Sequence, residues 1–267
     1  MNKFFIIGLP RTGTTAIAKT LNSYDNIYLY NKQVEEHKDN ESELFEPFAL
    51  TNIKVELDWE HKLKNIIEPT YNKTYNGFKI IPGDVVYAGD LTRDHNYDPL
   101  VVIRKDIWKS IFSKIGATYV SNTTKTIDAY VESSRSNNAD FSNFRHFTPR
   151  FIFFLSLYIK LIYDIETKFR TYIDKIYFED FIKPNTSYEK INEYFDQEII
   201  FNLNYNNDYN VIEEYLKDAN WTDEQYKILA EAVDATIQKF NIMDNNKVPP
   251  YLKDILANNP FKGVINE

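Results

Sequence analysis

The chain has 267 residues, of which 43% are hydrophobic and 16% aromatic, so it is long and apolar enough to form a full hydrophobic core. Its 39 acidic and 31 basic residues give a formal net charge of −8, which argues against a general nucleic-acid binder. It contains no cysteine, which excludes disulfides, thiolate metal sites and cysteine nucleophiles and fits a reducing compartment.

The first eighty residues alternate between short apolar runs that are typical of strands and patterns that are typical of helices. Residues 3–7 predict a buried parallel strand, residues 14–22 a helix and residues 26–30 a second strand. A helix in the segment DWEHKLKNIIEPTY should end before Pro69, because the residue before a proline disfavours the helical conformation. A turn at the Asn-Gly pair then leads into a third strand at 78–81.

The same alternation continues to the end of the chain. The remaining predicted elements are strands at 100–103 and 175–178 and helices at 107–115, 150–169, 186–195 and 223–240. Asp106 and Thr222 are the predicted N-caps of two of these helices. The polar residues 117–146 are typical of an exposed insertion or lid. We therefore predict one domain over residues 1–267, of class α/β, with three α/β/α layers around a central, mostly parallel sheet.

Two apolar stretches need to be distinguished from targeting or membrane segments. The run at 4–9 is shorter than the apolar region of a signal peptide, and no small-residue cleavage site follows it. The stretch FIFFLSLYIKLIY, which begins at Phe151, is too short to span a bilayer and contains Lys160. We therefore expect a soluble, cytoplasmic protein without a membrane anchor.

The segment GLPRTGTT, which begins at Gly8, connects the first predicted strand to the first predicted helix. In the ATP-binding loop G-x-x-x-x-G-K-[ST], a lysine follows the second glycine. Here Gly8 and Gly13 have this spacing and Thr15 fits the last position, but Thr14 replaces the lysine and the nearby cation is Arg11. Turn N–H groups, the helix dipole and two hydroxyls suit a phosphate without requiring lysine or magnesium. An ordinary strand-to-helix turn is the alternative.

The run PRTGTT resembles the first phosphate-binding loop of sulfotransferases, which typically reads PKSGTT, PRSGTT or PKTGTT. These enzymes transfer the sulfuryl group of PAPS, an adenosine nucleotide with a 5′-phosphosulfate and a 3′-phosphate, release PAP and need no metal. The resemblance implies a P-loop NTPase-like fold. It also implies that the nucleotide contacts the loop residues Pro10, Arg11, Thr12, Gly13, Thr14 and Thr15.

A second part of the resemblance concerns the 3′-phosphate. In the family, an arginine ends a strand and a serine follows in the pattern RDPxxxxxS. In VVIRKDIWKSIFS, Arg104 takes the arginine position, and Ser113 takes the serine position if Lys105 is an inserted residue. Ser110 is the alternative to Ser113. A capped surface helix with two solvated serines would explain the same pattern without a ligand.

A third segment, IYFEDFIKP, resembles the family's later strand followed by YEDL. Tyr177, Glu179 and Asp180 carry this similarity, which supports the fold more than the chemistry. We expect the two carboxylates to be structural.

Sulfuryl transfer needs cations near the leaving phosphate and the sulfonate, and a general base for the acceptor hydroxyl. The resemblance implies Arg11 for the leaving phosphate and Lys79, in GFKIIP, for the sulfonate. Family members use histidine or glutamate as the base, and the candidates here are Glu36, then Glu35, then His37. A solvated acidic run and a lysine that only flanks a strand are the alternatives.

Together these features predict a sulfotransferase that moves a sulfuryl group from PAPS to a hydroxyl acceptor by in-line displacement. The acceptor class stays open among small molecules, lipids, glycans and tyrosine, and the oligomeric state is open as well. A P-loop kinase for a small molecule or nucleotide is the first alternative, and it would need a displaced lysine and a magnesium-binding aspartate. A catalytically silent nucleotide-binding protein is the second.

Overall fold

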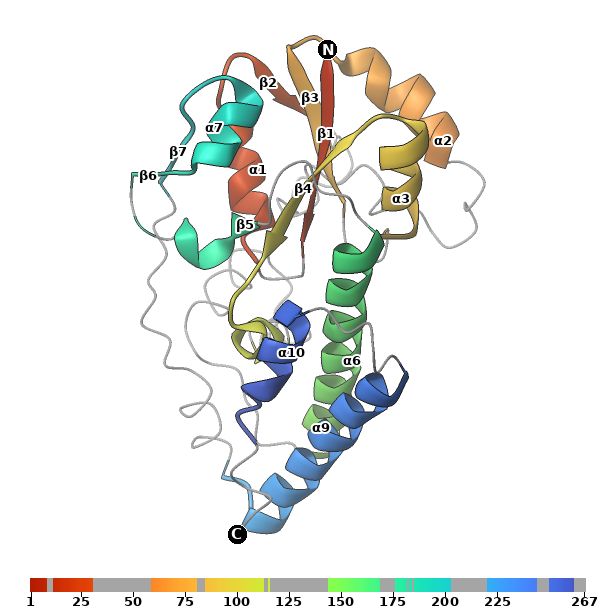
Figure 1. The fold of residues 1–267 in the computed structure, drawn as a ribbon, viewed down its shortest axis with the longest axis vertical. Helices are drawn as coiled ribbons and strands as arrows, with labels where there is room; N and C mark the ends of the chain where they lie inside the picture. Colours follow the sequence, from red (N-terminus) through yellow and green to blue (C-terminus); the bar gives the residue numbers. More distant parts are fainter. Residues whose placement is uncertain are drawn as a thin grey trace. The chain divides into compact units, whose positions relative to one another are not determined.

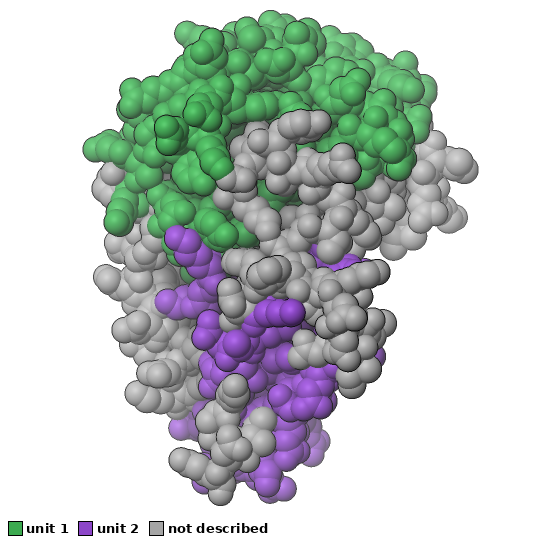
Figure 2. All heavy atoms as spheres, viewed as in Figure 1, with its two compact units in different colours: residues 1–104, 168–207 green, residues 105–167, 208–267 purple. Residues whose placement is uncertain are grey.

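The computed structural model describes residues 1–8, 12–30, 59–80, 85–112, 115, 144–168, 176–181, 183, 185–202, 220–243 and 250–261. The contacts between residues divide the chain into two compact units, which Figure 2 colours separately. Unit 1 comprises residues 1–104 and 168–207, and unit 2 comprises residues 105–167 and 208–267. The single domain over residues 1–267 stays a prediction.

Unit 1 contains a five-stranded sheet (Figure 1). Its strands are β1 (Asn2–Gly8), β2 (Ile27–Leu29), β3 (Tyr75–Ile80), β4 (Asp98–Ile103) and β5 (Ile176–Tyr177). They follow the order β2-β3-β1-β4-β5, and every neighbouring pair is parallel. The predicted α/β class with a central parallel sheet is thereby confirmed.

The helices of unit 1 lie on both sides of this sheet, with α1 and α7 on one side and α2 and α3 on the other (Figure 1). Their bounds are α1 (Thr14–Asn22), α2 (Trp59–Lys62), α3 (Val85–Asp94) and α7 (Glu189–Phe195). The α2 helix continues as a π-helix (Leu63–Ile67) and a 3-10 helix (Glu68–Thr70). This arrangement is compatible with three α/β/α layers.

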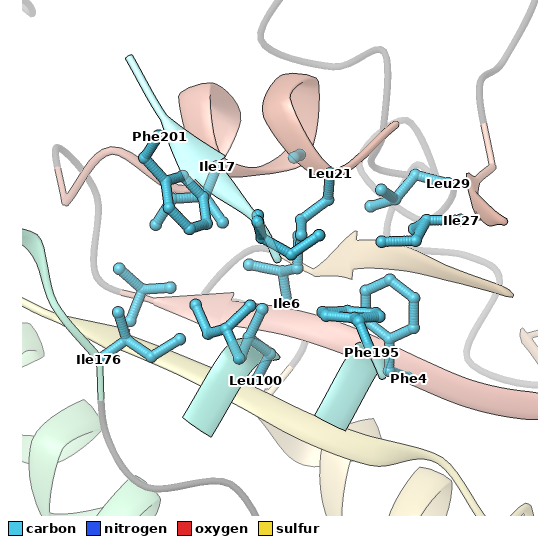
Figure 3. Close-up of a cluster of buried hydrophobic side chains, with 14 of the residues drawn as sticks. Phe4, Ile6, Ile17, Leu21, Ile27, Leu29, Leu100, Ile176, Phe195 and Phe201 are labelled. Carbon is cyan, nitrogen blue, oxygen red and sulfur yellow. The ribbon is translucent and has the colours of Figure 1, made fainter. Parts of the chain in front are cut away.

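The core of unit 1 explains why β1 is apolar on both faces. Phe4 and Ile6 point toward α1 and α7 in the cluster drawn in Figure 3, and Phe4 contacts Phe195 edge to face with 5.2 Å between the ring centroids. On the other face, the Phe5 ring stacks on Phe78 at 6.5 Å. Because helices cover both faces of a parallel sheet, its central strand reads as a continuous apolar run.

The third strand begins earlier than predicted, because the Asn-Gly pair lies within it and not in a turn. Asn76 is fully buried, and its Oδ1 accepts hydrogen bonds from the N–H groups of Asn72 and Lys73, both at 3.1 Å. The side chain of Asn76 thus closes the preceding turn while its backbone pairs in the sheet. A Cβ on Gly77 would lie 2.6 Å from the Phe4 carbonyl oxygen, so the close approach of β1 requires glycine here.

Two other predicted boundaries were wrong. The predicted helix at 186–195 begins only at Glu189, because Thr186–Ser187 form β6, which pairs antiparallel with β7 (Ile200–Phe201). Pairing with a distant segment overrides the local helical pattern there. The chain also remains helical past Pro69, since a 3-10 turn accommodates proline near its start.

The described part of unit 2 is helical. It contains a helix over residues 107–112, α6 (Phe144–Lys168), α9 (Asp223–Met243) and α10 (Pro250–Ala257). The α6 helix begins before the predicted residue 150 and includes the last three residues of the predicted lid, 117–146; the rest of that segment lies outside the described residues. None of the helices that the structure describes combines the length and hydropathy that crossing a bilayer requires.

Both predicted N-caps are confirmed. Asp106 Oδ1 accepts a hydrogen bond from the Lys109 N–H at 3.0 Å. The Gln225 N–H donates to Thr222 Oγ1 at 3.3 Å, and the Thr222 N–H donates to Gln225 Oε1 at 2.9 Å, which is the reciprocal arrangement of a capping box.

Candidate functional site

Gly8 and Gly13, the two glycines of the segment that joins β1 to α1, both lie where neighbouring groups approach closely. Gly13 is the N-cap residue of α1 in the left-handed conformation, with φ 78°, and its carbonyl accepts the Ile17 N–H at 3.0 Å. A Cβ on Gly13 would lie 2.6 Å from the Phe178 ring, and one on Gly8 would lie 2.6 Å from the Val102 carbonyl oxygen. Both positions therefore require glycine because neighbouring groups approach closely.

The first turn of α1 presents donors at the carboxyl end of the sheet. The N–H groups of a first helical turn have no acceptor within the helix, and the helix dipole adds positive potential there. Thr14 and Thr15 occupy this turn with half-buried side chains, no acidic residue lies in it, and Thr12 just before it is fully buried. The other predicted loop residues, Pro10 and Arg11, lie outside the described residues.

Lys79 is a buried cation beside this turn. Its register partner in β1 is Ile6, so its side chain lies on the sheet face that α1 covers. Lys79 is only 4% exposed, and its Nζ donates a hydrogen bond to Thr15 Oγ1 at 2.8 Å. Thr14 takes the position of the lysine in the ATP-binding loop, and a lysine from the neighbouring strand β3 lies beside it instead.

The strand order brings a second cation to the same edge of the sheet. Because Gly8 pairs with Val102 and Ile7 with Ile80, the carboxyl ends of β1, β3 and β4 are level, and Arg104 follows β4 directly. The neighbours of β1 are β3 on one side and β4 on the other, so the strand order changes direction at β1. Ligands of open parallel sheets bind at such points, outside the carboxyl ends.

Arg104 contacts the turn after β5, which is η5 (Phe178–Asp180). Its Cζ lies 5.2 Å from the centroid of the Phe178 ring, and its Nε lies 3.6 Å from Glu179 Oε1. The same phenyl ring lies against Gly13, so it connects the start of α1 to Arg104. Sequence analysis did not single out Phe178 and treated Glu179 as structural; no local signal pointed to their contact with Arg104, which depends on the parallel pairing of β4 with β5.

Among the predicted serines and the candidate bases, the structure describes only Ser110. Ser110 belongs to unit 2 and is fully buried, and its Oγ has no hydrogen-bond partner among the described residues. The alternative interpretation of Ser110 as a solvated surface serine was therefore wrong, and its role at the 3′-phosphate stays a prediction. Ser113 and the three candidate bases, Glu35, Glu36 and His37, lie outside the described residues.

A cavity of about 580 Å³ lies elsewhere in unit 1, along the edge strand β2. Tyr24, Tyr28, Tyr30 and Lys73 are among the residues that line it. The pKa of Tyr30 is raised, mainly by burial and to a smaller extent by the nearby charge of Tyr28. None of the predicted site residues that the structure describes lines this cavity. It is therefore separate from the group around Thr15, Lys79 and Arg104.

Comparisons of the chain with protein-family models, with curated proteins and with solved structures found no match. The resemblance to sulfotransferases therefore depends on the residues of this chain alone. The strongest of these are the loop before α1 and the two buried or partly buried cations beside it, Lys79 and Arg104.

Proposed function

We propose that this chain is a sulfotransferase that binds PAPS at the loop between β1 and α1. The observation that carries the proposal is the hydrogen bond of 2.8 Å from Lys79 Nζ to Thr15 Oγ1. A buried ammonium is costly unless hydrogen bonds or negative charge surround it. Lys79 lies beside the N-terminus of α1, and both the ammonium and the helix N-terminus attract negative charge, which supports an anionic ligand there.

The two cations suit a nucleotide with two separate phosphate groups. Lys79 and the first turn of α1 would hold the 5′-phosphosulfate, and Arg104 would hold the 3′-phosphate. The Phe178 ring, which lies against Gly13 and under the Arg104 guanidinium, supports this assignment because it joins both positions within unit 1. A guanidinium is well suited to this role, since its fork of donors pairs with two phosphate oxygens at once.

When bound, PAPS supplies the sulfuryl group that the acceptor oxygen attacks. The hydroxyls of Thr14 and Thr15 would donate hydrogen bonds to the leaving phosphate. The Lys79 ammonium would lie beside the transferring sulfonate, and Arg11 is proposed to stabilise the negative charge that grows on the bridging oxygen of the leaving phosphate. Fixed donors of this kind contribute most when they point to where charge develops in the transition state.

The acceptor hydroxyl must lose its proton to a base within hydrogen-bond reach. Glu36, then Glu35, then His37 are the proposed candidates. The proposed acceptor is a small molecule, a lipid, a glycan or a tyrosine, each of which carries the hydroxyl that the reaction needs.

The position of Lys79 also favours a second candidate function, a P-loop kinase. Such an enzyme would use Lys79 as the displaced lysine on the β- and γ-phosphates of ATP, with a magnesium-binding aspartate after a later strand.

Calorimetric titration of the protein with PAP, and separately with ATP and magnesium, distinguishes the two functions. We expect PAP to bind, and Thr14→Ala and Thr15→Ala each to weaken it by about 1.5–3 kcal/mol, because each removes a hydrogen bond to a charged group. Thr20→Ala, in the same helix but remote from the loop, is the matched control and should bind like the wild type. Tighter binding of ATP with magnesium would favour the kinase.

Turnover of labelled PAPS with a panel of hydroxyl acceptors tests the chemistry itself. Binding of PAP without turnover on any acceptor class would instead support a catalytically silent nucleotide-binding protein. Equal PAP affinity in the wild type and both loop variants would show that the nucleotide binds elsewhere.

A further inference from the structure

The ion pair between Arg104 and Glu179 puts an acidic side chain at the position proposed for the 3′-phosphate. We propose that Glu179 competes with the 3′-phosphate for Arg104 and thereby sets how strongly the site selects nucleotides that carry this group. This inference rests on the proposed function and concerns the selectivity of the same site.

The strand pairing explains why Glu179 meets Arg104. In the parallel pair of β4 and β5, Ile103 is level with Tyr177, so Arg104 and Phe178 are the next residues along each strand. The chain then turns in η5, where the Phe181 N–H bonds to the Phe178 carbonyl at 3.0 Å. This single turn leaves Glu179 beside the guanidinium, and the Phe178 ring lies against the guanidinium with 5.2 Å between Cζ and the ring centroid.

The exposure of the pair makes it displaceable. The side chains of Arg104 and Glu179 are 15% and 27% exposed, and the distance from Arg104 Nε to Glu179 Oε1 is 3.6 Å, longer than a hydrogen bond. Water and salt screen such a pair, so it is weak. A phosphate that pairs with the guanidinium through two short hydrogen bonds binds it more strongly.

Displacement leaves the Glu179 carboxylate close to the bound phosphate, and two anions near one cation repel each other. Neutral glutamine at position 179 removes both the competition and the repulsion. The affinity for a nucleotide with a 3′-phosphate should therefore rise by about three- to tenfold, the scale of a partly exposed charge interaction. The affinity for the same nucleotide without that phosphate should not change.

The experiment is calorimetric titration with PAP and with AMP, which differ only in the 3′-phosphate. The proteins are the wild type, Glu179→Gln and Asp180→Asn, which removes the same charge from the neighbouring position of η5 and is the matched control. We expect Glu179→Gln to bind PAP about three- to tenfold more tightly than the wild type and to bind AMP equally well. Asp180→Asn should match the wild type with both ligands. Combined with Arg104→Ala, Glu179→Gln should give no gain.

Each other outcome has a defined meaning. If wild-type protein binds PAP and Glu179→Gln binds it equally or less tightly, Glu179 orients Arg104 instead of competing for it, and this inference alone is overturned. An equal gain in Asp180→Asn would also overturn it, because the effect would then be one of net charge. Absence of PAP binding by the wild type would overturn the proposed function and this inference with it. Glu179→Ala provides a second variant if the glutamine variant fails to fold.

Discussion

Replacing Gly13 with alanine should destabilise the protein, because Gly13 has a φ of 78° and lies against a buried ring. A residue with a Cβ loses about 1–2 kcal/mol in the left-handed conformation. The new Cβ would lie 2.6 Å from Phe178, which is only 1% exposed, so the ring must move within a packed core. Such overpacking costs a further 1–3 kcal/mol or so, roughly 2–5 kcal/mol in all.

Equilibrium unfolding in urea measures this loss, and Gly89→Ala is the matched control. Gly89 lies in α3, and a Cβ there would have no atom within 4 Å, so alanine should raise the free energy of unfolding by about 0.5–1 kcal/mol. The urea midpoint of Gly13→Ala should fall by about 1–2 M for a typical denaturant slope. If Gly13→Ala unfolds at or above the wild-type midpoint while Gly89→Ala behaves as expected, the left-handed conformation of Gly13 against Phe178 is wrong.

Three further changes test other parts of the site and core. Lys79→Met, which keeps the apolar stem, should weaken PAPS binding at least about tenfold in a calorimetric titration without lowering the urea midpoint, and unchanged affinity for PAPS would remove Lys79 from the site. Arg11→Ala should lower kcat about 10²–10³-fold, with a smaller change in PAPS affinity, in a turnover assay. Arg11→Lys should recover part of the rate. If Arg11→Ala weakened PAPS binding and left kcat unchanged, Arg11 would be a binding residue only. The pKa of Tyr97 is raised above its ordinary value, first by burial and then by the neighbouring Tyr71 hydroxyl. Above about pH 10 the hydroxyl of Tyr97 therefore ionises mainly in the unfolded state, and the free energy of unfolding falls as the pH rises. When urea unfolding is measured at pH 8 and at pH 10.5, Tyr97→Phe should lose about 0.8 kcal/mol less of its free energy of unfolding than the wild type does. An equal loss in Tyr97→Phe and in the wild type would contradict this.

Several features of this protein follow from local sequence alone. The continuous apolar run in β1 and the helix from Thr14 to Asn22 were predicted with nearly their observed bounds. Asp106 and Thr222 were recognised as caps. Each of these depends on residues that lie within a few positions of one another, where turn chemistry and hydrophobic period decide the conformation.

The tertiary structure decided what lies beside the start of α1. Lys79 reaches Thr15 only because the register of β3 against β1 turns its side chain toward α1. Glu179 meets Arg104 only because β5 pairs in parallel with β4. Strand order and register depend on contacts between residues that are far apart in the chain, and a shift of one residue would turn these side chains to the opposite face of the sheet.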